Sequence, residues 1–242
     1  MFLKSILTNF YMYKILKNLF LFLKIKILFP FYQKYFYNFD ISKISIDSLF
    51  YPKTVKSEIY RDSLFDIVKK KYNYKIKRVL DFGCGIGSNI PFIFKNFKNI
   101  EYYAYDNNSS IVESLNRANN IIYKKKIHYL NKNEIFKINE NFFDLIIVDA
   151  CAMYFSKKEI FKYFNLFNKI TSKSILIHDL NHFNEKIIIK KMEGKNIINY
   201  NKFFKKINPD LKLTFQKSHK PGYPWHQFGY IILIEKYKPL TD

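Results

Sequence analysis

The segment VLDFGCGIGSNI (79–90) holds three glycines within five positions, shortly after an apolar run that ends at Asp81. Gly83, Gly85 and Gly87 remove side chains from alternate positions, so a ligand could approach the backbone there. A helix that begins just after such a turn offers unpaired N–H groups and the positive end of its dipole. The pattern therefore predicts a ligand-binding turn, and a tight structural turn without a ligand is the alternative.

A second acid, Asp106, comes 25 residues after Asp81 and ends the extended run IEYYAYD (100–106). An acid in this position accepts hydrogen bonds from ribose hydroxyls in nucleotide-binding α/β proteins. The dinucleotide fingerprint G-x-G-x-x-G fails, because Ser88 stands where the third glycine should be. Asp81 would also lie beside a pyrophosphate, whereas a carboxylate there suits a ligand that carries positive charge.

Groups that could move a proton follow another apolar run, in ILIHDLNH (175–182). Histidine titrates near neutral pH and is the commonest general base. We predict that His178 or His182 takes a proton from an acceptor, with Asp179 orienting the ring. His226, near the C-terminus, is the second candidate base. The alternatives are a loop of capped, solvated polar residues after the strand and a surface histidine at 226.

Extended and helical segments alternate along the chain and would position these residues. We expect strands at 77–82, 100–106, 126–130, 142–149 and 174–179. We expect helices at about 57–71, from the glycine turn to about 97, from the capping box SIVE (110–113), and from the capping box SKKE (156–159) to about 169. This alternation predicts a parallel sheet with right-handed crossovers and helices on its faces.

The C-terminal part breaks the alternation. The runs DLKLTFQK (210–217) and QFGYIILIEKY (227–237) are joined by SHKPGYPWH, which leaves no room for a helix. They predict a hairpin, so the mostly parallel sheet should end with an antiparallel strand. Ligands of such sheets bind beyond the carboxyl ends of the strands, where the glycine turn and the ends of the fourth and fifth strands should meet.

The stretch VLDFGCGIG resembles the first motif of class I (Rossmann-like) S-adenosylmethionine-dependent methyltransferases, which reads apolar-apolar-acid-x-Gly-x-Gly-x-Gly. It matches at every fixed position, and the resemblance extends over about residues 57–237. It implies an α/β fold of three layers: a Rossmann-like, mostly parallel sheet with a terminal antiparallel strand. The methyltransferase domain would span 51–242 and follow an N-terminal amphipathic, helical segment at 1–50.

The resemblance also implies roles for residues at the sheet edge. Asp81 and the three glycines of the turn would surround the methionine part of S-adenosylmethionine. Asp106 would hold the ribose hydroxyls, and Asn107 would lie against the adenine. Asp149, at the end of FFDLIIVD (142–149), would border both the cofactor and the acceptor.

The chain departs from the family in two places. Many members carry an aspartate after the third strand that reaches the adenine amino group, and here the stretch reads LNKNE (130–134). Asn131 or Asn133 could accept the same hydrogen bond. The usual Pro-Gly-Gly before the fifth strand is replaced by TSKS (171–174), which affects a turn and not the chemistry.

A metal-dependent variant is an alternative. Asp149, with Asp179 and Asn181 after the next strand, resembles the ligand set of magnesium-dependent O-methyltransferases. There, carboxylate and amide oxygens hold Mg²⁺, which lowers the pKa of the acceptor hydroxyl. The other residues of that set have no clear counterparts, so we assign no metal ligands and keep Mg²⁺ as the alternative.

The charge balance is strongly basic, with 41 Lys and Arg against 20 Asp and Glu, a net charge of +21. Such a charge suggests a nucleic acid or an anionic membrane as partner. However, Arg61, Arg78 and Arg117 are the only arginines, and Ile, Asn, Tyr and Phe are abundant, as expected for A/T-rich codons. Lysine lacks the planar fork that recognises phosphates and bases, so we expect a small acceptor, anionic or sugar-like, rather than nucleic acid.

The N-terminal segment predicts an amphipathic helix at about 11–24. Lysines interrupt each apolar run before it reaches the length of a membrane span, and no small-residue cleavage site follows. Cys84 and Cys151 have neither metal-type nor disulfide-type spacing, which favours a reducing cytoplasm. We expect a cytoplasmic protein whose helix packs on the main domain, or lies on the inner face of the membrane through residues 1–30.

Together these features predict an enzyme that transfers a methyl group from S-adenosylmethionine to a small polar acceptor, a hydroxyl of a sugar or related metabolite. The chain carries no added RNA-binding module, and no N/D-P-P-Y/F tetrad of amino methyltransferases occurs. An RNA methyltransferase is the first alternative because of the charge. A non-catalytic, membrane-associated protein with the cofactor fold is the second.

Overall fold

The computed structural model describes residues 55–72, 75–85, 87–108, 112, 115–116, 119, 126–192, 194–220 and 224–236. The predicted N-terminal segment, with its membrane contact through residues 1–30, lies outside these residues. So do Ser110 and Glu113 of one predicted capping box. Within the described part of the chain, no helix has both the length and the apolar character that crossing a membrane requires.

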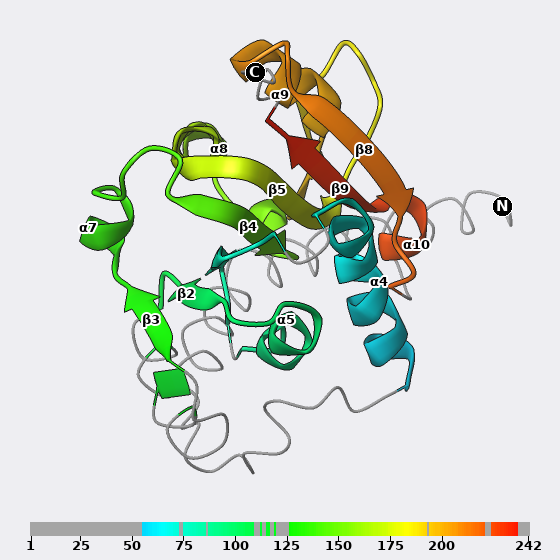
Figure 1. Cartoon of the computed structure of the whole chain (residues 1–242). Coiled ribbons are helices and arrows are strands. Elements are labelled where there is room, and N and C mark those ends of the chain that lie inside the picture. The colour runs from blue at the N-terminus through cyan, green and yellow to red at the C-terminus, as the bar shows by residue number, and fades with distance from the viewer. Residues whose placement is uncertain are drawn as a thin grey trace, which may run out of the picture. The chain divides into compact units, whose positions relative to one another are not determined.

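A seven-stranded sheet forms the centre of the protein, in the order β3-β2-β1-β4-β5-β9-β8 (Figure 1). Its strands are β1 (Arg78–Phe82), β2 (Glu101–Tyr105), β3 (Ile127–Leu130), β4 (Phe143–Asp149), β5 (Thr171–Leu180), β8 (Lys212–Lys217) and β9 (Gly229–Glu235). Strands β1 to β5 are parallel, and β9 is antiparallel to both of its neighbours, β5 and β8. The predicted mostly parallel sheet, with an antiparallel strand last in the chain, is confirmed.

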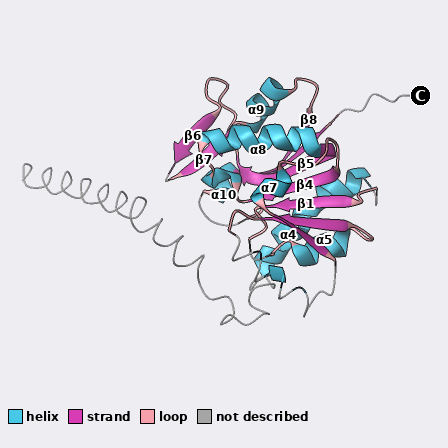
Figure 2. Ribbon diagram, turned by 90° about the vertical axis from the view of Figure 1, so that its left-hand side faces the viewer, coloured by secondary structure: helices cyan, strands magenta, loops and turns pink. Residues whose placement is uncertain are grey.

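Helices cover both faces of this sheet and complete three layers. They are α4 (Val55–Tyr72), α5 (Ile90–Asn96), α7 (Lys132–Ile135), α8 (Lys157–Ile170), α9 (Tyr200–Ile207) and α10 (Trp225–Phe228), with a 3₁₀ turn, η3 (Ala152–Tyr154). Figure 2 shows α8 and α9 on one side of the sheet and α4 and α5 on the other. The layers follow from strands that are apolar on both faces, since only helices on both sides can bury them.

The main core lies between the sheet and the pair α8 and α9. Phe164 and Phe167 of α8 and Phe204 of α9 pack there with alternate strand residues such as Ile146 and Ile232. The start of α8 is the predicted capping box, in which Ser156 and Glu159 each accept the other's backbone N–H. On the opposite face, α4 buries Leu64, Phe65 and Val68.

Two segments differ from the prediction. Residues 183–209, left unassigned by the sequence, form an antiparallel pair, β6 (Ile189–Met192) and β7 (Lys195–Ile198), followed by α9. The stretch after β8, expected to hold no helix, contains the single turn α10, which starts after Pro224. Strand β5 is also longer than expected, because α8 runs into it without a loop and Thr171 closes that helix by donating to the Phe167 carbonyl at 2.6 Å.

Candidate functional site

The glycine turn joins β1 to α5 and is tied to the end of β2. The N–H groups of Gly83 and Cys84 both donate to the carbonyl of Tyr105, at 2.7 and 3.0 Å. Gly83, Gly85 and Gly87 have φ angles of +73°, +53° and +77°. This left-handed region favours glycine, so the spacing of the three residues follows from the shape of the turn.

The three glycines differ in what a side chain would meet. A Cβ on Gly83 would lie 2.8 Å from Cys151 Sγ, and one on Gly87 would lie 2.7 Å from Leu115 Cδ1. A Cβ on Gly85 would meet no described atom within 4 Å outside its chain neighbours. Packing within the protein therefore accounts for two of the glycines, whereas Gly85 borders open space that a ligand could enter.

Asp106 lies directly against this open position. Its Oδ2 accepts the N–H of Gly85 at 2.9 Å, and its Oδ1 accepts the N–H of Asn108 at 2.9 Å. Each carboxylate oxygen keeps capacity for a further hydrogen bond. Asn107, which lies between Asp106 and Asn108 in the sequence, is exposed. The structure thus places acceptors for two hydroxyl groups beside bare backbone.

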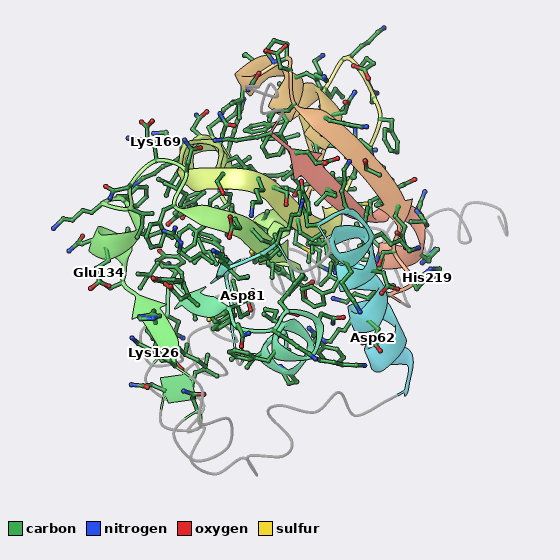
Figure 3. All side chains as sticks on the ribbon, viewed as in Figure 1. Asp62, Asp81, Lys126, Glu134, Lys169 and His219 are labelled. Atoms are coloured by element: carbon green, nitrogen blue, oxygen red, sulfur yellow. The ribbon has the colours of Figure 1, made fainter. Side chains whose placement is uncertain are left out.

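Asp81 lies in the interior, just before the turn, as Figure 3 shows. It is fully buried, and its carboxylate accepts hydrogen bonds from the Tyr102 hydroxyl at 2.9 Å and from Asn89 Nδ2 at 3.4 Å. Burial raises the pKa of Asp81 to about 7, although the hydrogen bond from Tyr102 opposes this rise. A nearby positive charge would favour its ionised form, so this carboxyl is suited to a cationic ligand.

Asp149, at the end of β4, contacts a polar side chain of strand β5 and another of helix α4. Its Oδ1 lies 2.7 Å from His178 Nδ1, and its Oδ2 lies 3.4 Å from Nη1 of Arg61 on α4. The same Arg61 nitrogen donates to Asn89 Oδ1 at 2.5 Å, and Asn89 contacts Asp81. Burial alone would raise the pKa of Asp149, but His178 and Arg61 together hold it well below its ordinary value.

His178, the predicted base, is fully buried. Its Nε2 lies 2.7 Å from Ser218 Oγ, and its ring packs on the indole of Trp225 with centroids 4.7 Å apart. Both ring nitrogens therefore contact protein groups. The acid that contacts the imidazole is Asp149 and not Asp179, which corrects the predicted orientation.

The other residues predicted to take part in proton transfer each have their own contacts and exposure. Asp179 is fully buried, and its two oxygens accept the N–H groups of Met153 and Leu180 at 3.0 and 2.7 Å. Burial raises the pKa of Asp179 to about 7. His182 Nδ1 accepts the N–H of Asn184 at 3.1 Å, and His226 is exposed on α10.

The magnesium alternative does not fit the residues present. Asp149 holds His178 and Arg61, Asp179 accepts two backbone N–H groups, and Asn181 Oδ1 accepts the N–H of Tyr200 at 3.1 Å. The oxygens of all three proposed ligands are thus directed at protein donors. No cluster of three or more His, Cys, Asp or Glu side chains in the described ranges could hold a metal ion.

Asn131 has a structural role at the start of α7. Its Oδ1 accepts the N–H groups of Asn133 and Glu134, at 2.8 and 3.0 Å, and Glu134 returns a hydrogen bond to the N–H of Asn131. The residue is therefore the N-cap of α7 in a capping box. Contact with an adenine would have to share this oxygen or use its amide nitrogen, and Asn133 remains exposed beside it.

Sequence reasoning missed Arg61, Asn89 and Ser218 as members of the site. One signal was present for Arg61: it is one of three arginines in a chain that otherwise uses lysine. One of its nitrogens, Nη1, contacts both Asn89 and Asp149. Ser218 carries no signal of this kind, because its partner His178 is 40 residues away in sequence.

The strand order, the antiparallel β9 and the glycine turn after β1 together define the Rossmann-like fold of class I S-adenosylmethionine-dependent methyltransferases. The chain has this fold. No protein-family model and no curated protein matches it, so the similarity is found among solved structures.

The plantazolicin methyltransferase BpumL, solved with a desmethylplantazolicin analogue and SAH, is one such structure. The two chains are 15% identical, with a TM-score of 0.56 over 85% of this chain and 94% of BpumL. A SAM-dependent methyltransferase from Aquifex aeolicus is 19% identical, with a TM-score of 0.51 over 82% of this chain and 98% of that one. The protein PH0226 of Pyrococcus horikoshii is 12% identical, with a TM-score of 0.56 over 84% of this chain and 98% of its own.

Proposed function

We propose that the protein transfers a methyl group from S-adenosylmethionine to a small polar acceptor. The observation that carries this proposal is the pairing of Gly85 with Asp106: bare backbone beside open space, held 2.9 Å from a carboxylate that can accept further hydrogen bonds. The methyltransferase structures with the same fold, one of them solved with SAH, support the choice of cofactor.

We assign the cofactor-binding roles along the edge of the sheet. Asp81, with Gly83, Gly85 and Gly87, contacts the methionine part, whose positive charge the buried carboxylate favours. Asp106 accepts the ribose hydroxyls. Beyond the ribose, the adenine lies against Asn107 and Asn131, and Asp149 lies where the cofactor and the acceptor meet.

The bound cofactor supplies a methyl group already activated by its sulfonium. The protein's tasks are therefore to align an acceptor with that methyl group and, for a hydroxyl, to take its proton. We propose an oxygen of a sugar or related metabolite as the acceptor. His178, held by the ionised Asp149, is the first candidate base; His182 and His226 are the others.

The charge of the protein favours an anionic acceptor. The charges of Arg61 and Lys220 both help to lower the pKa of Asp149, against the opposing effect of its burial. Burial, first of all, lowers the pKa of Lys220, and the repulsion of Arg61 adds to this. A ligand with negative charge near these two cations would offset their repulsion.

Calorimetry with S-adenosylhomocysteine tests the proposal without knowledge of the acceptor. Gly85→Ala adds one methyl group to the open side of the turn and should weaken binding at least tenfold. Gly194→Ala is the matched control, because Gly194 has a φ of +78° and lies in the β6–β7 turn. Its backbone strain of about 1–2 kcal/mol should be similar, with unchanged affinity. A wild-type protein that binds no S-adenosylhomocysteine, or equal affinity in all three proteins, contradicts the proposal.

The net charge of +21 favours RNA methylation as a second candidate. Contacts to phosphates release counterions, so RNA affinity would fall steeply as salt rises. Fluorescence anisotropy with a labelled single-stranded and a labelled structured RNA, at 50 and 200 mM salt, distinguishes the candidates. Tight binding that selects one RNA would favour this second function, and weak, unselective binding would favour the small acceptor.

A further inference from the structure

Three side chains from distant parts of the chain form a continuous line of hydrogen bonds at the carboxyl end of the sheet. Asp149 ends β4, His178 lies in β5, and Ser218 follows β8. Asp149 Oδ1 and His178 Nδ1 are 2.7 Å apart, and His178 Nε2 and Ser218 Oγ are also 2.7 Å apart.

Hydrogen-bond chemistry fixes the direction of this line. An ionised Asp149 can only accept, so His178 Nδ1 must carry the proton. In the neutral ring Nε2 then has the lone pair, and the Ser218 hydroxyl donates to it. The backbone N–H of Lys220 donates to Ser218 Oγ at 3.0 Å, and Ser218 N–H donates to the Gly229 carbonyl at 3.1 Å.

The surroundings hold the three groups in place. His178 has no exposed surface and packs on Trp225, whereas Ser218 keeps 6% of its surface exposed. Of the two residues, only the serine therefore borders solvent. The Lys220 ammonium lies 4.0 Å from the same Trp225 ring.

We propose that Ser218 is an activated nucleophile that accepts the acyl group of a small ester. Its Oγ attacks the ester carbonyl while its proton passes to His178 Nε2, and the ionised Asp149 stabilises the resulting imidazolium. The bond to the alkoxide then breaks and that oxygen takes the proton. Water repeats the sequence, which releases the acid and restores Ser218. This activity requires no methyl donor, although it uses His178 and Asp149, which also serve in the methyl transfer proposed above.

Another serine of the protein shows what is particular to Ser218. The Ser172 hydroxyl also contacts a carboxylate, Asp144, at 3.2 Å, and donates to the Phe143 carbonyl at 3.0 Å. It has no imidazole between itself and the acid. A reagent that responds only to serine exposure or to a neighbouring carboxylate would favour Ser172, whereas a reagent that requires an activated hydroxyl would select Ser218.

The test uses a biotinylated fluorophosphonate on the full-length protein, with the modified residue located by peptide mass spectrometry. Reaction forms an Oγ–P bond at serine, breaks the P–F bond, and sends the serine proton to His178 as fluoride leaves. We expect an adduct at Ser218 that forms at least tenfold faster in the native protein than in the urea-unfolded chain. Ser218→Ala should abolish it, His178→Gln should slow it at least a hundredfold, and Ser172→Ala should leave it unchanged.

Two results would overturn the proposal: no faster labelling of Ser218 in the native than in the unfolded chain, or labelling of Ser218 that His178→Gln leaves undiminished. The comparison of native and unfolded wild-type protein holds even if a variant fails to fold. Titration of each sample with S-adenosylhomocysteine reports on the methyl-transfer proposal separately, so the failure of one is distinguishable from the failure of the other.

Discussion

Replacing Asp81 with asparagine should stabilise the fold at pH 8 and remove cofactor binding at the same time. The carboxyl is fully buried, and burial raises its pKa from an ordinary value of 3.8 to about 7. At pH 8 the folded protein must therefore hold a buried, ionised carboxylate. Asparagine keeps the shape and can still bond the Tyr102 hydroxyl, but it carries no charge.

The magnitude follows from proton linkage. Because the pKa is higher in the folded state, the folded protein binds the proton more tightly. The protonated Asp81 therefore makes its full contribution to the free energy of unfolding below about pH 4. This contribution is lost as the pH rises to about 7. At about 1.4 kcal/mol per pH unit, the loss is about 1.5 kcal/mol at pH 5 and about 4 kcal/mol at pH 8. Asparagine does not titrate, so its advantage over aspartate should grow by about 3 kcal/mol between these pH values.

Urea denaturation of both proteins at pH 5 and pH 8 measures this difference. Asp144→Asn is the matched control at the other end of the sheet, because Asp144 accepts the N–H groups of Lys77 and Arg78 and pairs with Lys173 at 2.9 Å. Burial opposes these contacts, but they lower the pKa of Asp144, so its loss should destabilise the fold at pH 8. An Asp81→Asn protein that is no more stable than wild type at pH 8, or a gap that does not change with pH, would refute the reasoning.

Three further predictions concern the same end of the sheet. Gly83→Ala should destabilise the fold by about 1–3 kcal/mol in urea denaturation, because the new Cβ would meet Cys151 Sγ at 2.8 Å. Adding Cys151→Ala to this variant should restore part of the lost stability. Ala150→Gly should stabilise the fold by about 1 kcal/mol, since Ala150 has a φ of +56°; an unchanged midpoint would argue against strain there. Arg61→Met should weaken S-adenosylhomocysteine binding about tenfold in calorimetry, because an uncharged side chain donates to neither Asp149 nor Asn89; full affinity would show that these contacts are dispensable.

Local patterns were enough to predict the sheet and the glycine turn. The apolar run of β4 predicts a strand buried on both faces, and Ser156 with Glu159 predicts the start of α8 from four residues. The glycine turn is likewise local, because its positive φ angles leave few residue types that fit. Each of these features depends on residues that are neighbours in sequence, which is why a single sequence reveals them.

The arrangement around His178 could not be predicted in this way. Whether Asp149 or Asp179 holds the imidazole depends on the register between β4 and β5, which places Asp149 opposite His178. Side chains of successive strand residues point to opposite faces, so Asp179, although adjacent in sequence, is directed away from the ring. Short Lys-rich strands such as β6 give no alternating pattern, so the β6–β7 pair was also missed.

Three unfavourable features of the molecule lie at the same end of the sheet. Asp81 and Asp179 are buried carboxyls whose pKa values are raised to about 7, and Ala150 occupies a left-handed conformation. At the opposite end Asp144 is fully paired, and its pKa is lowered despite the opposing effect of burial. Stability alone would favour neutral residues in place of Asp81 and Asp179 and a glycine at 150. These residues lie near Gly85, which borders open space. A positively charged ligand in that space would offset the free-energy cost of ionising the two buried carboxyls, as expected of a binding site.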